Sequence, residues 1–186
     1  MSNNSKDYVL PPRANKDDGS ARMVGFELEF SGVSLDETAD AVQSAIRGKL
    51  KSESAAERVI DTSSYGEFII ELDWDYLKRK ASEADSEEEG NEWLERLSEA
   101  AALLVPVEVV CPPIPLDRLS DLDAMVSALR DAGAVGTEES LIAAYGGHIN
   151  TEIPRLDADT LFDYLRSLAL LQWWPVSYTH LRAHET

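Results

Sequence analysis

The sequence predicts an α+β protein built on a mainly antiparallel sheet. Several stretches alternate apolar and polar residues with the period of a half-buried strand. Between them lie stretches whose apolar residues recur every three or four positions, as in an amphipathic helix. The predicted order is strand, helix, two strands, helix, strand, helix, strand, helix, with no internal repeat.

The first half of the chain contains three predicted strands and one helix. Residues 1–20 are polar and predict an irregular lead-in. RMVGFELEFSG alternates strictly, so it predicts a strand with its apolar side chains on one face and Glu27 and Glu29 on the other. SLDE is a capping box, which predicts a helix that begins after Ser34 and continues through about Leu50. RVIDTSSYGEFIIELD predicts two strands joined by a Ser-Ser-Tyr-Gly turn.

The middle of the chain predicts a helix, a strand and a second helix. The first helix is expected from about Glu92 to Leu104, after an acidic stretch. VPVEVVCPPIP predicts a strand that its two prolines stop, because proline cannot donate to a ladder. The next helix, ending near Gly133, carries four residues on one face: Leu119, Leu122, Val126 and Leu129.

One more strand and one more helix are predicted near the end. YGGHINTEIP predicts a short strand that is closed by Pro154. The last helix, from Asp157 to Trp174, presents four leucines on one side: Leu161, Leu165, Leu168 and Leu171.

Composition excludes several classes of partner. The chain has 35 acidic and 17 basic residues and a net charge of −18, so no basic patch exists to bind nucleic acid or an anionic membrane. Cys111 is the single cysteine, which excludes an internal disulfide and fits a reducing compartment. No apolar run is long enough to span a bilayer, and the first residues lack the apolar core of a signal peptide. We therefore expect a cytoplasmic protein.

Acidic residues recur at in-phase positions of four predicted strands. They are Glu27 and Glu29, Glu71 and Asp73, Glu108, and Glu152, which follows His148 and Asn150. One interpretation is the solvated face of an antiparallel sheet. The other is a metal site, because carboxylates two apart on a strand lie about 7 Å from each other and repel unless a cation separates them. Oxygen ligands with one His or Asn suit Mg²⁺ or Mn²⁺.

Four ordered blocks resemble the amidoligase family. They are LPPRANKDDGSARMVGFELEFSG, VPVEVVCPPIP, LRDAGAVGTEESLIAAYGGHINTEIP and LFDYLRSLALLQWW, so the likeness extends from about Val9 to Trp174. This family is grouped with glutamine synthetase and glutamate–cysteine ligase. The resemblance implies a curved antiparallel sheet with helices on its outer face, like the glutamine synthetase catalytic domain. It also implies that the concave side binds ATP through Mg²⁺, that a carboxylate becomes an acyl phosphate, and that an amine attacks it to give an amide.

The resemblance also implies site residues. Glu27 and Glu29 match the metal-holding G-x-E-x-E strand, Glu108 a metal or substrate position, and His148, Asn150 and Glu152 the G-H-x-N-x-E strand. The expected catalytic residues are therefore Glu27, Glu108 and His148, and the expected cofactor-binding residues are Asn150, Glu152 and Arg155. The expected metal ligands, for Mg²⁺ or Mn²⁺, are Glu27, Glu29, Glu108, His148 and Glu152. The segment carrying Glu71 and Asp73 departs from the family pattern, so their roles stay open.

The end of the chain differs from the family. PVSYTHLRAHET resembles the translation of a sequencing adapter. We therefore expect residues 21–174 to be the N-terminal portion of a catalytic domain and 175–186 a non-native tail. A sheet incomplete at its C-terminus would leave this chain inactive as a ligase.

Three functions remain open at this level. The first is the ATP-dependent ligase, whose partners would be a small-molecule or peptide carboxylate and an amine, with a homo-oligomer also compatible. The second is a Mg²⁺-dependent phosphoester hydrolase that uses the same carboxylates. The third is a non-catalytic acidic binding module.

Overall fold

The computed structural model describes residues 8–73, 105–136 and 146–172, which fall into two units. The larger unit comprises Met1–Val9 and Met23–Thr151, and the smaller comprises Leu10–Arg22 and Glu152–Thr186. The predicted helix at 92–104 lies outside the described residues.

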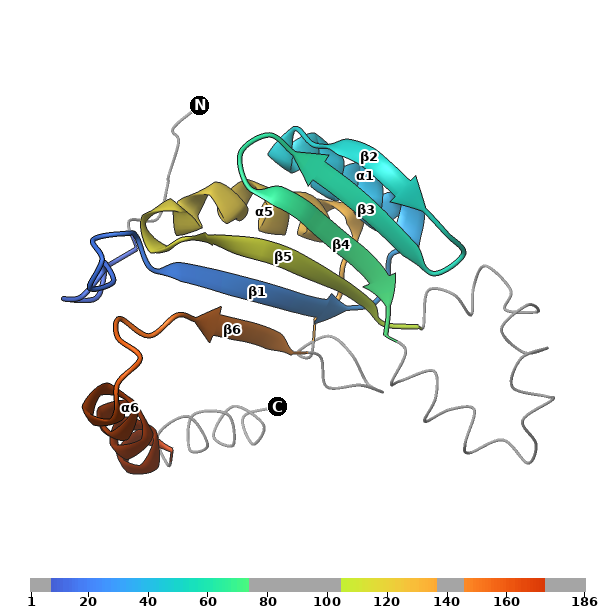
Figure 1. Cartoon of the computed structure of the whole chain (residues 1–186). Helices are drawn as coiled ribbons and strands as arrows, with labels where there is room; N and C mark the ends of the chain where they lie inside the picture. The colour runs from blue at the N-terminus through green and yellow to red at the C-terminus, as the bar shows by residue number, and fades with distance from the viewer. Residues whose placement is uncertain (1–7, 74–104, 137–145, 173–186) are drawn as a thin grey trace. The chain divides into compact units, whose positions relative to one another are not determined.

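The larger unit is built on a curved, six-stranded antiparallel sheet (Figure 1). Its strands are β1 (Met23–Phe30), β2 (Lys49–Glu53), β3 (Glu57–Thr62), β4 (Gly66–Leu72), β5 (Val107–Pro115) and β6 (Gly147–Thr151). Their order across the sheet is β2-β3-β4-β5-β1-β6. Strands β5 and β6, which come late in the chain, thus flank β1 on its two sides. This sheet and its accompanying helices confirm the predicted α+β class.

Two helices cover one face of this sheet (Figure 1). They are α1 (Leu35–Ile46) and α5 (Asp123–Ala132), and the 3₁₀-helix η1 (Leu116–Leu122) leads into α5. The core lies between them and the sheet, and it includes Val24, Phe30, Val42, Ile60, Phe68, Ile70, Val107, Val109, Ile114, Met125 and Leu129. The capping box at the start of α1 is confirmed, because the Glu37 N–H donates to Ser34 Oγ at 3.2 Å. The predicted end of α5 is also confirmed, at left-handed Gly133.

The prediction that the first helix continues through Leu50 is wrong. Helix α1 ends at Ile46, and the chain turns through a left-handed Arg47 and Gly48 into β2, which contains Leu50. Gly48 passes so close to the core that a Cβ there would lie 2.4 Å from Ile60 Cγ2. The chain thus leaves the helix at the left-handed Arg47, and the missing side chain of Gly48 lets it pass against Ile60. The sequence analysis missed β2.

The prediction that the two prolines of VPVEVVCPPIP stop its strand is also wrong. Strand β5 continues through Pro112-Pro113 to Pro115, and Ile114 pairs with Val24 of β1. The register of the two strands shifts by one residue between the Cys111–Phe26 and Ile114–Val24 pairs. The extra residue on β5 forms a bulge, which lets the strand pass the proline pair without a continuous ladder.

The smaller unit contains helix α6 (Ala158–Leu171) and the segment Leu10–Arg22. Asp157 caps the helix by accepting the Thr160 N–H at 2.8 Å, close to the predicted start. The four leucines predicted on one side of this helix, Leu161, Leu165, Leu168 and Leu171, are exposed. In the part of the chain that the structure describes, no helix combines the length and apolar character needed to cross a bilayer.

Candidate metal centre

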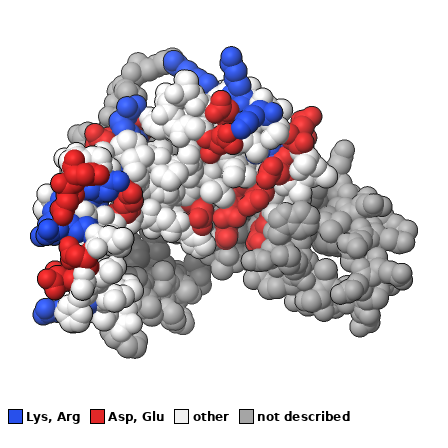
Figure 2. Space-filling view, viewed as in Figure 1, with Lys and Arg blue, Asp and Glu red and all other residues white. Residues whose placement is uncertain are grey.

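The sheet face opposite α1 and α5 carries polar side chains in ordered rows. Strand register sets one acidic row across four strands: Glu57, Glu71, Glu108 and Glu29. The row beside it contains Val59, Ile69 and Val110 and ends with Glu27 and His148. Figure 2 shows this face, with a band of acidic side chains bordering a surface that is free of charge. Four of the acids predicted in phase from the sequence are therefore neighbours in space: Glu27, Glu29, Glu71 and Glu108.

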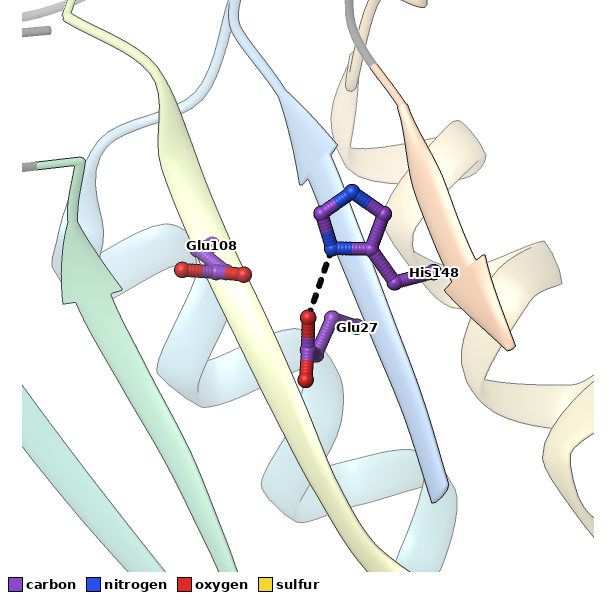
Figure 3. Close-up of side chains that lie close together, drawn as sticks. All are labelled: Glu27, Glu108 and His148. Carbon is purple, nitrogen blue, oxygen red and sulfur yellow. Dashed lines mark hydrogen bonds and ion pairs between the residues drawn. The ribbon is translucent and has the colours of Figure 1, made fainter. Parts of the chain in front are cut away.

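Glu27, Glu108 and His148 form a cluster at the junction of these two rows. Each offers one ligand atom, and the three atoms lie within 4.8 Å of one another. Figure 3 shows that the side chains come from the adjacent strands β1, β5 and β6 and converge. Glu27 Oε2 lies 2.7 Å from His148 Nδ1. Asn150 Nδ2 donates to the other carboxylate oxygen, Glu27 Oε1, at 3.0 Å. Glu27 is thus fixed by two side chains of β6, those of His148 and Asn150.

Glu108 lies among other carboxylates. Its burial raises the pKa of the carboxyl, and the charges of Glu29, Glu27, Glu71 and Asp73 raise it further, in that order. Among the ion pairs of the described residues, none joins a lysine or arginine to Glu29, Glu71 or Glu108. Like charges directly opposite each other destabilise a sheet. A cation bound here would remove that repulsion.

Repulsion between carboxylates also affects Glu71, the neighbour of Glu108 in the acidic row. Burial raises the pKa of Glu71, and the charges of Glu57 and Asp73 raise it further. Sequence analysis left the roles of Glu71 and Asp73 open, and the structure places Glu71 directly opposite Glu108. Glu57 was not recognised as part of this row, because only the pairing of β3 with β4 brings it opposite Glu71.

The remaining candidate residues have different surroundings. Glu29 Oε2 accepts the Gly146 N–H at 3.3 Å. The expectation that Glu152 shares one strand face with His148 and Asn150 is wrong, because β6 ends at Thr151. Glu152 belongs to the smaller unit, where its carboxylate lies 3.3 Å from Lys16 Nζ. Arg155 also belongs there, with its Nε 2.6 Å from Asp17 Oδ2. The roles of these residues stay predictions.

The donor set fits a hard divalent cation. Two carboxylates and one imidazole converge on the same small volume. Oxygen-rich sets with one nitrogen suit Mg²⁺ and Mn²⁺ better than they suit a closed zinc site, which prefers thiolates and imidazoles. The nearby carboxylates of Glu29 and Glu71 add negative charge without a basic partner among the described residues. Glu27, Glu108 and His148 are therefore the residues that would hold the ion, with Glu29 beside them.

The Glu27–His148 contact predicts a measurable pKa difference. The hydrogen bond to Glu27 raises the pKa of His148, and the charges of Glu27, Glu29 and Glu108 act in the same direction. Because the folded pKa is raised, the contact stabilises the fold at pH values below the unfolded pKa, about 6.5. This contribution is lost as the pH rises through the folded pKa.

Glu27→Gln should lower the His148 pKa in EDTA-treated protein, and Glu29→Gln should lower it less. Imidazole NMR titration measures both; an unchanged pKa in Glu27→Gln would contradict the contact.

Comparison with known proteins decides the family. A family model described as "Putative amidoligase enzyme" matches residues 20–182. The chain belongs to the amidoligase family. The match includes all three strands that carry the cluster, and it confirms the resemblance noted in the sequence. The family description supports a ligase as the class of enzyme.

The two other comparisons give no match. No curated protein and no solved structure matches the chain significantly. The expected likeness to the glutamine synthetase catalytic domain therefore stays a prediction.

Proposed function

We propose that this amidoligase-family chain carries the metal site of an ATP- and Mg²⁺-dependent carboxylate–amine ligase. The ligase would form an amide through an acyl phosphate, from a small-molecule or peptide carboxylate and an amine. The observation that carries the proposal is the convergence of Glu27, Glu108 and His148 on the sheet face opposite α1 and α5. Family membership supplies the reaction class.

Each residue of the cluster has a role that follows from its contacts. Glu27, Glu108 and His148 would hold the divalent ion, which would offset the charge of the ATP phosphates. Asn150 fixes one oxygen of the Glu27 carboxylate and leaves the other facing His148. Glu108, between Glu29 and Glu71, supplies the negative charge that a cation would offset.

The backbone before β6 also supports the proposal. The Glu29 N–H donates to the Gly146 carbonyl at 3.0 Å, and the Gly146 N–H donates back to the Glu29 carboxylate at 3.3 Å. This exchange holds the start of β6 against the end of β1. It thereby fixes where His148 projects, two residues further along. Phosphoryl transfer depends on such positioning rather than on a protein nucleophile.

The test of this function is the formation of ADP that depends on an amine. ATP and Mg²⁺ are supplied to the protein with a panel of carboxylates, with and without amines. A ligase should release ADP only when both substrates are present. Glu27→Gln should reduce that rate at least about a hundredfold, because a metal ligand is lost.

Two outcomes would point to other functions. Phosphate release from ATP or a phosphoester without an amine, abolished by Glu27→Gln, would indicate the hydrolase. The absence of any nucleotide or metal response would favour the acidic binding module. Glu53→Gln, which alters an exposed acid of β2, serves as the matched control and should leave every rate unchanged.

A further inference from the structure

The smaller unit contains a depression whose lining includes none of the residues of the metal cluster. It has a volume of about 460 Å³ and is lined by residues 12–15, Asp17, Pro154 and Arg155. That volume lies in the range of sites that bind small organic molecules. Its lining includes two arginines, on a chain whose net charge is −18. We therefore considered which groups surround the side chains of Arg13 and Arg155.

The two arginines differ in their partners. Arg155 Nε lies 2.6 Å from Asp17 Oδ2 and 3.3 Å from Asp157 Oδ2. The side chains of Arg155 and Asp17 are 50% and 64% exposed, so their ion pair contributes little to stability and can exchange partners readily. For Arg13, the residues that the structure describes offer its guanidinium no hydrogen bond or ion pair. Among the described residues, Arg13 therefore has no competing partner for its guanidinium, and Arg155 has only an exposed ion pair to break.

A third arginine, Arg22, connects the two segments that line the depression. Arg22 is only 3% exposed, and its guanidinium donates to the backbone carbonyl of Arg13 at 2.7 Å and to that of Glu152 at 2.8 Å. It also donates to Tyr164 Oη at 3.0 Å. These bonds connect the segment that carries Arg13 with the one that precedes Pro154 and Arg155. Both walls are thereby held before any ligand arrives, which reduces the entropy cost of binding.

We propose that this depression binds the oxyanion group, carboxylate or phosphate, of a small organic molecule. Arg13 contacts the anion directly, and Arg155 turns from Asp17 to complete the contact. Arginine suits this role because its planar guanidinium donates two parallel hydrogen bonds to either group. Asp17 acts as an internal competitor that occupies Arg155 when no ligand is bound. The inference does not depend on ligase chemistry, because anion binding here requires neither turnover nor a metal.

The experiment is an NMR titration of the 186-residue chain in EDTA, so that no metal bridges the anion to Glu27. Inorganic phosphate and succinate are the two probes, and the Arg13 and Arg155 Nε–H resonances are followed. Arg13→Gln should weaken binding about tenfold, because it removes a charge-assisted hydrogen bond. Asp17→Asn should strengthen binding about threefold, because it removes the competing carboxylate. Arg118→Gln, which alters an exposed arginine of the larger unit, should leave binding unchanged.

The outcomes distinguish the source of the anion and can overturn the proposal. A response to succinate alone identifies a carboxylate ligand, and a response to phosphate alone identifies a phosphorylated one. Equal responses to the two probes support an oxyanion site that does not distinguish carboxylate from phosphate. The proposal is overturned if neither anion shifts the Arg13 resonance at about 50 mM, well above a millimolar dissociation constant. It is equally overturned if Asp17→Asn weakens binding, since Asp17 would then be part of the site rather than its competitor.

Discussion

Mg²⁺ or Mn²⁺ should raise the melting temperature of this protein. The metal-free fold holds Glu27, Glu29, Glu108 and Glu71 close together without a basic partner for the last three among the described residues. A cation bound to the folded state alone, at a concentration of about a hundred times its dissociation constant, would add about 2.7 kcal/mol to the free energy of unfolding. For a chain of this size, that corresponds to a rise of several degrees, about 5–10 °C. Calorimetry with added metal and with EDTA measures the difference.

Two variants show whether the cluster is responsible. Glu27→Gln should remove most of the stabilisation by metal, because Glu27 is the carboxylate that both His148 and Asn150 contact. Glu53→Gln, an exposed change on β2, should retain it. Identical melting curves with metal and with EDTA, in the unsubstituted protein, would contradict the metal site. Equal loss in both variants would show that the metal acts through overall charge instead.

Arg22→Met should unfold the smaller unit locally. The Arg22 guanidinium is almost fully buried and satisfies the carbonyls of Arg13 and Glu152 and the hydroxyl of Tyr164. Methionine can fill much of the space but donates no hydrogen bond, so these three acceptors lose a charged donor. Hydrogen bonds to a charged group contribute about 1.5–3 kcal/mol each, and we expect a local loss of about 3 kcal/mol.

Hydrogen exchange measures this loss residue by residue. Amides of Leu10–Arg22 and of α6 should exchange faster in Arg22→Met, while those of β4 and β5 should keep their protection. Arg166→Met, on the exposed surface of the same helix, is the control and should change neither group. Unchanged exchange in α6 of the Arg22 variant would show that the contact to Tyr164 does not hold the helix.

Local sequence patterns were enough to predict most of the sheet. Strict alternation in RMVGFELEFSG identified β1 and both of its faces, because a strand that packs on one side must bury every second residue. The capping box identified the start of α1 for a similarly local reason. The errors occurred where tertiary contacts override local preference. After α1 ends at a left-handed Arg47, Gly48 lets the chain pass against Ile60, and a bulge carries β5 past its prolines.

The candidate site could be predicted in part. The in-phase acids of β1 and β5, with His148, were visible in the sequence, because side chains on one strand face recur every second residue. The row that joins Glu57 to Glu71 was not, since it depends on which strands pair and in what register. The burial of Arg22 was also missed, because nothing local distinguishes a buried arginine from the exposed ones near it. Glu152 follows the strand pattern in sequence but lies past the end of β6.

Paramagnetic broadening by Mn²⁺ is the most direct test of the metal centre. Mn²⁺ is added in small amounts to isotope-labelled protein, and amide signals are recorded across the larger unit. Signals of Glu27, Glu108 and His148 should broaden first, together with their neighbours on β1, β5 and β6, and excess Mg²⁺ should restore them. Signals of β2, at the other edge of the sheet, should stay sharp. Uniform broadening along all acidic surfaces, or broadening that leaves His148 unaffected, would contradict a metal site at this cluster.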